Sequence, residues 1–340
     1  MRAVVFDRFS GPASVRSVPD PSPSDTGVVI AVESTGLCRS DWHGWAGHDP
    51  GIGLPHVPGH EFAGAIAAVG RSVEGWSVGD RVTVPFVCAC GACASCVRGG
   101  QTVCERQTQP GFTHWGSFAE HVAVENAAVN LVALPEDVSS DVAAALGCRV
   151  ATSYRAVVGQ GRVAPGEWVA VHGCGGVGLA AVAIAAAAGA QVVAVDISPQ
   201  ALDLACDLGA RAVAANADEV VEITGGGAHL SLDALGSPQT CAGSILSLRR
   251  WGRHVQVGLF AEDPVVPMSR VIAWELTLLG SHGLAAHAYP DLLALVRSGK
   301  VPVESMITRR IGLADAPVAL STMDTALASG ITVIDPRKSA

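Results

Sequence analysis

Two hydrophobic patterns divide the chain. In the first half, short runs rich in valine, alanine or aromatic residues are separated by Gly, Pro and Asp. Short apolar runs bounded by turn residues predict β-strands. We therefore expect a β-rich N-terminal region with strands at 2–6, 28–34, 62–69 and 117–124.

From Glu167 the pattern changes to alternating strands and helices. We expect strands at 168–172, 191–196, 211–214, 229–234, 253–257 and 276–280, and helices at 176–188, 199–208 and 238–249. Six strands with helical crossovers predict a doubly wound parallel sheet. A helix at 139–158 precedes this region.

The C-terminal segment returns to a mixed pattern, with helices expected at 286–298 and 313–328 and strands at 306–311 and 331–334. We expect it to pack on the N-terminal region. This predicts a discontinuous catalytic domain at 1–150 and 286–340 and an inserted dinucleotide-binding domain at 151–285.

The uncharged stretch 168–195 is long enough to suggest a membrane span. It contains five glycines, however, and its halves have the character of a strand and then a helix. A buried β-turn-α-β unit is the better interpretation.

Composition narrows the function classes. The 340 residues suffice for two domains, and the net charge of −9 argues against nucleic-acid binding. No basic run would seek anionic lipid, and the apolar N-terminal run is too short for a signal peptide. We therefore expect a cytoplasmic protein.

Five of the ten cysteines lie between Cys88 and Cys104. Without a secretion signal, such a cluster indicates metal binding rather than disulfides. Four of them have the spacing C-x2-C-x2-C-x7-C, namely Cys90, Cys93, Cys96 and Cys104. Four thiolates close a tetrahedral site, which predicts a structural zinc lobe at 88–105. An iron–sulfur cluster and a redox pair are the rivals, and Cys88 stays unassigned.

A second group of residues predicts an open zinc site. Cys38 and His60 are zinc ligand types, and Cys148 completes a Cys2His set with a fourth position for water or substrate. Cys148 by itself would be ordinary core. Glu61 is a looser ligand candidate, and Asp41 is a candidate to accept the other N–H of His60.

Ser40 and His43 lie beside Cys38 and could move a proton away from a metal-bound alcohol. The histidines at 48, 56, 114 and 121 are near this site in sequence. We interpret those four as loop or surface residues.

A glycine motif predicts the hydride acceptor. The turn Gly173-Cys174-Gly175-Gly176-Val177-Gly178 follows an apolar strand and opens an apolar helix, and Asp196 ends the next strand. Glycines admit a pyrophosphate to a helix N-terminus, and the carboxylate binds the ribose diol. Because a 2′-phosphate would face Asp196, we expect NAD to be preferred over NADP about a hundredfold or more.

Together these residues resemble the zinc-dependent medium-chain alcohol dehydrogenase family over nearly the whole chain. Its G-x-C-x-S/T-D…H pattern matches Gly36 to His43, its GHE motif matches Gly59 to Glu61, and its four-cysteine lobe and third zinc ligand also match. The resemblance implies a GroES-like catalytic domain with an inserted Rossmann domain. Cysteine at 148, where polyol dehydrogenases tend to have Glu, favours an alcohol dehydrogenase.

The resemblance also implies further roles. Arg39 would contact the cofactor pyrophosphate, and Val177, Val257 and Leu259 would lie near the nicotinamide. Phe86, Trp42 and Trp115 would line or close the substrate pocket, although packing is an equal interpretation for the two tryptophans. Thr332 stands where the family often has a second pyrophosphate arginine.

We therefore predict an oxidoreductase with two zinc ions per chain and NAD(H), acting on a small alcohol or carbonyl compound. Ser40 would take the alcohol proton and pass it through the cofactor ribose to His43. A zinc-free quinone or enoyl reductase, a polyol-type dehydrogenase and a non-catalytic NAD sensor are the alternatives. The family suggests a homotetramer or homodimer.

Overall fold

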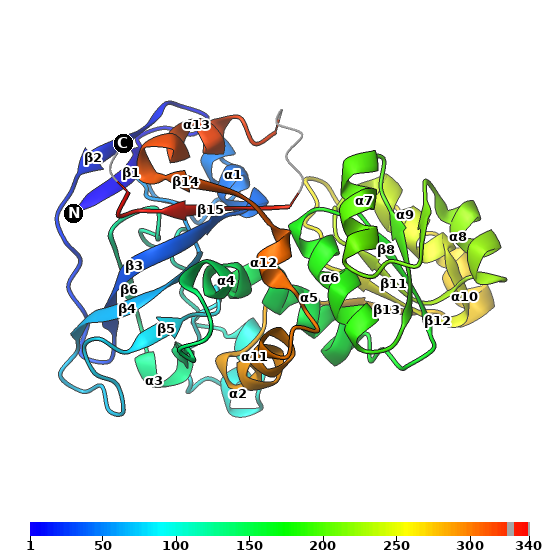
Figure 1. Ribbon diagram of the computed structural model, residues 1–340, viewed down its shortest axis with the longest axis horizontal. Coiled ribbons are helices and arrows are strands. Elements are labelled where there is room, and N and C mark those ends of the chain that lie inside the picture. Colours follow the sequence, from blue (N-terminus) through cyan, green and yellow to red (C-terminus); the bar gives the residue numbers. More distant parts are fainter. Residues whose placement is uncertain (325–329, 339–340) are drawn as a thin grey trace. The chain divides into compact units, whose positions relative to one another are not determined.

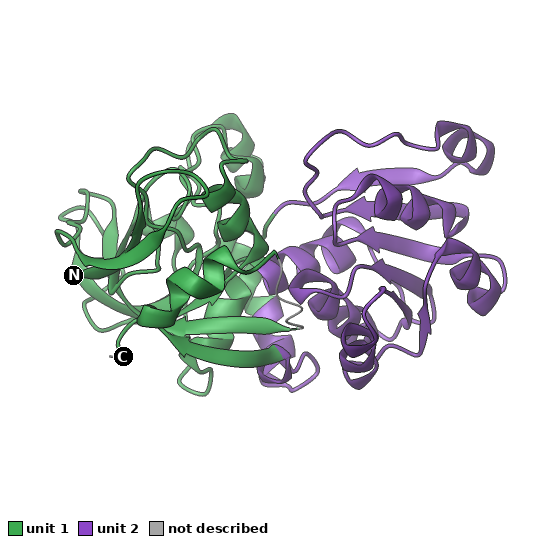
Figure 2. Ribbon diagram, turned by 90° about the horizontal axis from the view of Figure 1, so that it is seen from above, with its two compact units in different colours: residues 1–148, 283–291, 307–340 green, residues 149–282, 292–306 purple. Residues whose placement is uncertain are grey.

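The computed structural model describes residues 1–324 and 330–338 and divides them into two compact units (Figures 1 and 2). Unit 1 contains residues 1–148, 283–291 and 307–340, and unit 2 contains 149–282 and 292–306. The segment 292–306 thus belongs to unit 2, whereas the sequence-based division placed it in the catalytic domain. We propose that unit 1 is the catalytic domain and unit 2 the dinucleotide-binding domain.

Unit 1 is built on a seven-stranded mixed sheet of order β14-β15-β3-β4-β5-β7, with β6 paired to β3. Its strands are β3 (Val28–Leu37), β4 (Glu61–Val69), β5 (Arg81–Thr83), β6 (His121–Val124), β7 (Val132–Ala133), β14 (Ile307–Gly312) and β15 (Ile331–Asp335). A hairpin of β1 (Arg2–Phe6) and β2 (Ala13–Ser17) lies beside it. Valine and isoleucine side chains of β3 and β4 fill the core with Phe62.

The helices of unit 1 are short. They are α1 (Arg39–Ala46), α2 (Ala94–Val97), η1 (Gln101–Val103), α3 (Ala127–Asn130), α4 (Ser140–Ala145), η4 (Ala286–Ala288), η5 (Leu313–Asp315) and α13 (Ala316–Ser321). The helix expected at 313–328 begins as η5 and α13, and its last residues lie outside the described part of the chain. The strand expected at 117–124 is confined to β6.

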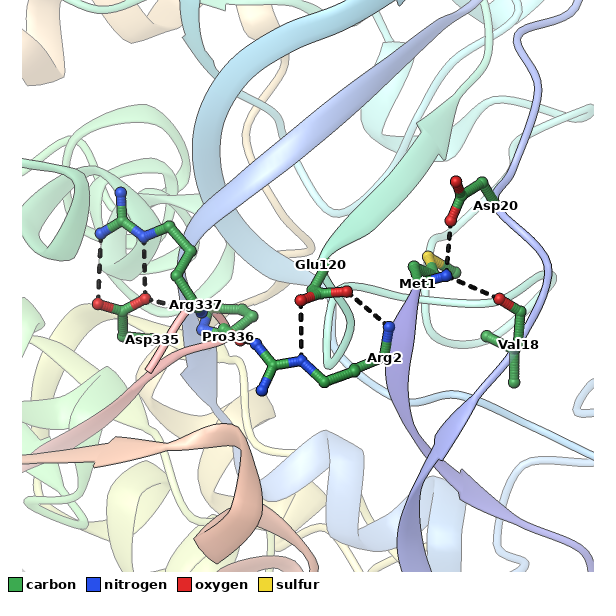
Figure 3. A network of polar contacts seen from close by, with 8 residues as sticks. All are labelled: Met1, Arg2, Val18, Asp20, Glu120, Asp335, Pro336 and Arg337. Atoms are coloured by element: carbon green, nitrogen blue, oxygen red, sulfur yellow. Dashed lines mark hydrogen bonds and ion pairs between the residues drawn. The ribbon is translucent and has the colours of Figure 1, made fainter. Parts of the chain in front are cut away.

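Polar contacts join both ends of the chain inside unit 1 (Figure 3). The N-terminal ammonium donates to Val18 O at 2.8 Å and to Asp20 at 2.6 Å. Arg2 binds the Glu120 carboxylate and the Pro336 carbonyl oxygen, at 2.8 and 3.0 Å from its guanidinium. The predicted return of the C-terminal segment to the N-terminal region is therefore visible in β15 and in this network.

Unit 2 contains the predicted parallel sheet. Its order β10-β9-β8-β11-β12-β13 is the doubly wound order 3-2-1-4-5-6 when the strands are counted along the chain. The strands are β8 (Trp168–His172), β9 (Gln191–Val195), β10 (Ala212–Ala214), β11 (Ala228–Asp233), β12 (Leu248–Gln256) and β13 (Thr277–Gly280). All neighbouring pairs are parallel.

Helices connect these strands: α6 (Gly176–Ala187), α7 (Pro199–Asp207), α8 (Ala217–Thr224), α9 (Pro238–Leu246) and α10 (Met268–Trp274). α11 (Tyr289–Arg297) and α12 (Val303–Met306) follow. The helix expected at 238–249 ends earlier because β12 already begins at Leu248. The order of β8 and β11 reverses the winding of the sheet, and dinucleotides bind at such a point in this architecture.

The helix expected at 139–158 is interrupted by wider turns. After α4 come a π-helix, η2 (Leu146–Val150), then α5 (Ala151–Tyr154) and a second π-helix, η3 (Arg155–Gln160). A π-turn inside a helix frequently marks a functional site. Among the described residues, no helix is both long and apolar enough to cross a membrane, and 168–195 forms a β-α-β unit instead.

Candidate functional site

Four potential ligands converge in unit 1. One ligand atom each of Cys38, His60, Glu61 and Cys148 lies within 4.8 Å of the others. Cys38, His60 and Glu61 are at most 5% exposed. This group contains every residue that the sequence predicted for the open zinc site.

Strand pairing creates this convergence. Cys38 caps α1 directly after β3, and His60 precedes β4. Because β3 and β4 are antiparallel with Gly36 opposite Glu61, the two ligands meet at one end of the pair. The π-turn η2 supplies Cys148 from a third element.

Gly147 allows the π-turn to approach β4, a role that the sequence did not reveal. A Cβ at this position would lie 3.1 Å from the Cα atom of Glu61. The carbonyl oxygen of Gly147 accepts from the Phe86 N–H at 3.1 Å, and the buried Tyr289 hydroxyl donates to the Leu146 carbonyl oxygen at 3.1 Å. The backbone beside Cys148 is thus held from both sides.

Asp41 orients two of the ligands. One carboxylate oxygen accepts from His60 Nδ1 at 2.8 Å and from the Gly59 N–H at 3.0 Å. The other accepts from the Cys38 N–H at 2.8 Å. With 1% of its surface exposed, this carboxylate fixes the His60 tautomer so that the Nε2 lone pair is available for a metal.

The donor set fits zinc. The buried His60 Nε2 has no hydrogen-bond partner among the described residues, although a buried polar atom is normally paired. Burial is the largest single influence and lowers the pKa of His60, but Asp41 and Cys38 together raise it by more, so that this pKa lies well above its ordinary value. The surroundings therefore favour positive charge at this ring, which a zinc ion at Nε2 would supply beside two thiolates.

The second metal group is the four-cysteine lobe. Cys93 Sγ lies 3.4 Å from Cys96 Sγ and 3.7 Å from Cys104 Sγ. Zn–S bonds of about 2.3 Å in a tetrahedron place sulfurs about 3.8 Å apart. None of the ten cysteines forms a disulfide. The lobe therefore fits a closed zinc site.

Backbone donors already point at these sulfurs. The Cys90 and Arg106 N–H groups both donate to Cys104 Sγ at 3.3 Å. The Ala92 N–H lowers the pKa of Cys90 to about 6, whereas burial raises the pKa of Cys96 to about 12. A metal ion would remove the protons from all four thiols.

The proposed proton-transfer residues lie on α1. Ser40 Oγ is 3.9 Å from Cys38 Sγ. His43 Nδ1 lies 2.8 Å from His48 Nδ1. Burial, followed by the neighbouring His48 and Arg39, lowers the pKa of His43 from its ordinary value. A neutral imidazole near pH 7 can accept a proton.

Aromatic residues surround the open site. Phe86 contacts the His60 ring edge-on with centroids 6.0 Å apart, and Phe112 lies 5.1 Å from the same ring. Phe112 was missed because its loop, Gly111 to Trp115, carries no periodic pattern. Trp115 donates to the Pro55 carbonyl oxygen at 3.0 Å, and both it and Trp42 pack against a buried cluster. Their role in the substrate pocket stays a prediction.

Other expected residues have defined surroundings. The Arg39 guanidinium lies 4.9 Å from the Trp42 ring centre and pairs with Asp324 at 3.0 Å. Thr332 lies in β15 opposite Leu37. His56 lies outside the named helices and strands, as a loop residue should, but it is not on the surface: it is 2% exposed and its Nε2 bonds the Gly111 carbonyl oxygen.

The glycine motif of unit 2 has the form that a pyrophosphate requires. Gly173 has φ of +89°, and a Cβ on Gly178 would lie 1.8 Å from the Gly173 carbonyl oxygen. Gly175 caps α6 with no side-chain hydrogen bond, and a Cβ there would meet nothing within 4 Å. The α6 N-terminus therefore offers unhindered backbone donors to an anion.

Asp196 links the turns around this motif. Its carboxylate accepts from the Cys174 N–H at 2.6 Å and from the Ser198 N–H at 2.8 Å. Because Ser198 caps α7, Asp196 is not the helix cap. It holds the glycine turn against the end of β9, where a ribose diol is bound in this architecture.

Hydrogen bonds to Asp233 hold the turn after β12, which carries Val257 and Leu259 and is predicted to lie near the nicotinamide. The Val257 N–H donates to the Asp233 carbonyl oxygen at 3.0 Å, and the Asp233 carboxylate accepts from the Leu235 and Gly236 N–H groups. Leu259 is 63% exposed. The sequence alone did not single out Asp233, although its place at the end of β11, a strand beside β8, is the available signal.

Comparison with known proteins gives consistent matches. The family model described as alcohol dehydrogenase GroES-like domain matches residues 24–136, and that described as zinc-binding dehydrogenase matches 176–298. An alcohol dehydrogenase of Geobacillus stearothermophilus is 35% identical over 88% of this chain and 90% of its own length. An NAD-dependent alcohol dehydrogenase of Sulfurisphaera tokodaii is 32% identical over 99% of this chain and 100% of its own length. The solved structure of an alcohol dehydrogenase from Thermus sp. ATN1 is 32% identical and has a TM-score of 0.91. The match covers 99% of this chain and 100% of that structure.

Proposed function

Because the chain belongs to the zinc-dependent medium-chain alcohol dehydrogenase family, we propose that it interconverts an alcohol and its aldehyde or ketone, with NAD(H) as the hydride carrier. The observation that carries this proposal is the open ligand set in unit 1. His60 Nε2, which has no hydrogen-bond partner in the described part of the chain, converges with Cys38 and Cys148, and the same chain holds the glycine motif and Asp196. A reductase that works without metal needs no such ligand set.

The protein residues prepare the substrate oxygen for reaction. Zinc, when bound by Cys38, His60 and Cys148, supplies a Lewis acid that lowers the pKa of an alcohol oxygen. Asp41 keeps the His60 imidazole in the tautomer that can bind the metal. Glu61 is a further ligand candidate from the same group.

Ser40 and His43 would carry the proton of the substrate hydroxyl away from the reacting oxygen. The Ser40 hydroxyl, beside Cys38 Sγ, accepts the proton of the substrate hydroxyl while donating its own. His43 then receives a proton at its imidazole, which its lowered pKa keeps neutral near pH 7. Phe86 and Phe112 against His60 limit access of water to the reacting carbon.

Unit 2 selects the cofactor. NAD supplies the hydride acceptor, and the α6 N-terminus would hold its pyrophosphate, with Arg39 as a further cationic contact. The Asp196 carboxylate would bind the ribose diol and repel a 2′-phosphate, which favours NAD over NADP. Val177, Val257 and Leu259 would line the nicotinamide.

An NAD-linked activity panel over alcohols and their carbonyl products tests this function. The purified protein would be assayed with its metal content measured before and after a chelator. We expect two zinc ions per chain, activity with a subset of alcohols, and loss of activity with the open-site zinc. Full activity in verified metal-free enzyme would refute the proposal, and one zinc per chain would favour a zinc-free reductase or a sensor. We also propose a homo-oligomer, preferably a tetramer, which sedimentation would test.

A further inference from the structure

The His43 imidazole has a second imidazole as its partner. His43 Nδ1 and His48 Nδ1 lie 2.8 Å apart, and the ring centres are 5.1 Å apart. Both rings meet Trp42 edge-on, with centroids 5.0 and 5.5 Å away. His48 is exposed whereas His43 is half-buried, so the pair extends from the interior of unit 1 to solvent.

The local backbone builds this pair. α1 ends at Ala46, and Gly47 has φ of +88°. The His48 N–H donates to the His43 carbonyl oxygen at 3.0 Å, which returns the chain over the last turn of the helix. A Cβ on Gly47 would also lie 3.0 Å from the Phe9 ring, so glycine is required for conformation and for space.

We propose that His48 is the next member of the proton path, accepting from His43 Nδ1 and releasing the proton to water. The inference rests on the proposed function, because it concerns the proton that alcohol oxidation liberates. It gives His48 a role that its exposed position in a loop did not indicate.

The transfer balances in protons and charge. In the starting pair, His43 Nδ1–H donates to the His48 Nδ1 lone pair, and His43 Nε2 is unprotonated. A proton that arrives at His43 Nε2 allows the Nδ1 proton to move to His48, which then loses its Nε2 proton to water. One proton enters, one leaves, both rings end neutral, and ring reorientation restores the starting tautomers.

The charges around His43 favour onward transfer. Burial opposes a charged His43, and His48 and Arg39 add to this effect, while Cys38 and Asp324 oppose it. Arg39 is paired with Asp324, so its charge is partly compensated. A charge on the half-buried His43 is therefore disfavoured, which favours passing the proton on to its exposed neighbour.

The test is the pH dependence of alcohol oxidation in His48→Phe, which keeps a ring against Trp42 but has no nitrogen. We expect oxidation to slow about tenfold near pH 6 and less than about twofold near pH 9, where hydroxide accepts the proton; a direct general base is worth 10²–10⁴-fold. The KM for NAD should not change. His287→Phe, at another exposed histidine of unit 1, is the matched control.

Rescue distinguishes proton transfer from packing. Imidazole added to the buffer should restore the rate of His48→Phe near pH 6 but leave His287→Phe unaffected. Combining His48→Phe with His43→Ala should be no slower than His43→Ala alone, because both act on one path.

The failures are separable. A wild-type protein that forms no NADH with any alcohol overturns the proposed function and the relay with it. An active wild type whose His48→Phe variant keeps the same pH–rate profile overturns the relay alone. If the pH–rate profile of His48→Phe changes but added imidazole does not restore the rate, His48 acts on His43 only through its charge. That result also overturns the relay.

Discussion

Replacing Asp41 by Asn should weaken zinc binding at the open site while leaving the four-cysteine site intact. The carboxylate accepts from three donors: Cys38 N–H, Gly59 N–H and His60 Nδ1. An amide has one accepting atom and one donating group, so it cannot serve all three. The size of the defect follows from its two possible orientations.

In the first orientation, the amide oxygen faces His60 and Gly59, and the NH2 group meets the Cys38 N–H. A buried donor without a partner costs about 1–3 kcal/mol, and replacing the charged acceptor of the His60 bond adds about 1 kcal/mol. In the second, the NH2 group faces His60 Nδ1, and the ring proton is driven to Nε2. That tautomer has no lone pair for zinc.

Both orientations therefore oppose metal binding. Loss of a partner that orients a metal ligand typically lowers affinity 10–100-fold, or about 1.4–2.7 kcal/mol. We expect Asp41→Asn to lower the zinc affinity of the open site by this factor or more, because the substitution disturbs the backbone of Cys38 as well as the ring of His60. The protein itself should lose about 2–4 kcal/mol of unfolding free energy, the sum of the unpaired-donor cost and the weakened His60 bond.

A chelator competition on the folded protein measures this effect, with zinc released from each site followed separately. The four-cysteine site is the internal reference, and Asp80→Asn is the control, since its partly buried carboxylate accepts a backbone bond from the Ser77 N–H and lies in no ligand group. Asp41→Asn with the zinc affinity of the wild type at the open site would refute the orienting role.

Four further substitutions test other parts of the molecule. Cys104→Ser should lower the zinc content by one ion per chain and expose the 88–105 lobe to proteolysis, with activity lost only as the lobe unfolds. Gly175→Ala should fold like the wild type, because its Cβ meets nothing, yet bind NADH about tenfold or more weakly by titration. Gly178→Ala, whose Cβ would lie 1.8 Å from Gly173 O, should instead lower the melting temperature by several degrees. Burial lowers the pKa of His172 from 6.5 to about 3, so the folded state resists its protonation and stability falls as the pH drops below about 6.5. His172→Gln should reduce the loss of unfolding free energy between about pH 7 and 5 by about 2 kcal/mol in urea titrations, and an equal loss in both proteins would contradict this.

The fold was accessible from the sequence where local chemistry and periodicity agreed. In unit 2, apolar strands, glycine turns and helix caps all indicate the same alternation of strands and helices. The six observed strands lie within a few residues of the predicted ones. The exception is β12, which begins at Leu248. The short strands β5 and β7 carry too few residues for a pattern, and pairing with neighbouring strands defines them, whereas β2 lacks an apolar run because most of its side chains are exposed.

The candidate sites divide in the same way. The four-cysteine lobe is visible because its ligands are close in sequence. Cys148 alone gives no such signal, since a thiol in an apolar helix resembles core. It was predicted only as the third member of a set with Cys38 and His60, and β4 and η2 bring this set together. The His43–His48 contact depends on the left-handed conformation of Gly47, which no residue pattern specifies.

The π-turn that carries Cys148 has a consequence for how such a site can be gained or lost. A π-turn corresponds to an α-helix with one inserted residue, and each helical residue turns the chain by about 100°. Deleting Gly147 would let η2 relax to an α-helix between the anchored α4 and α5, and the thiol would rotate away from His60. A single codon deletion could thus uncouple the metal from the scaffold with every ligand still encoded, and a single insertion could reverse it.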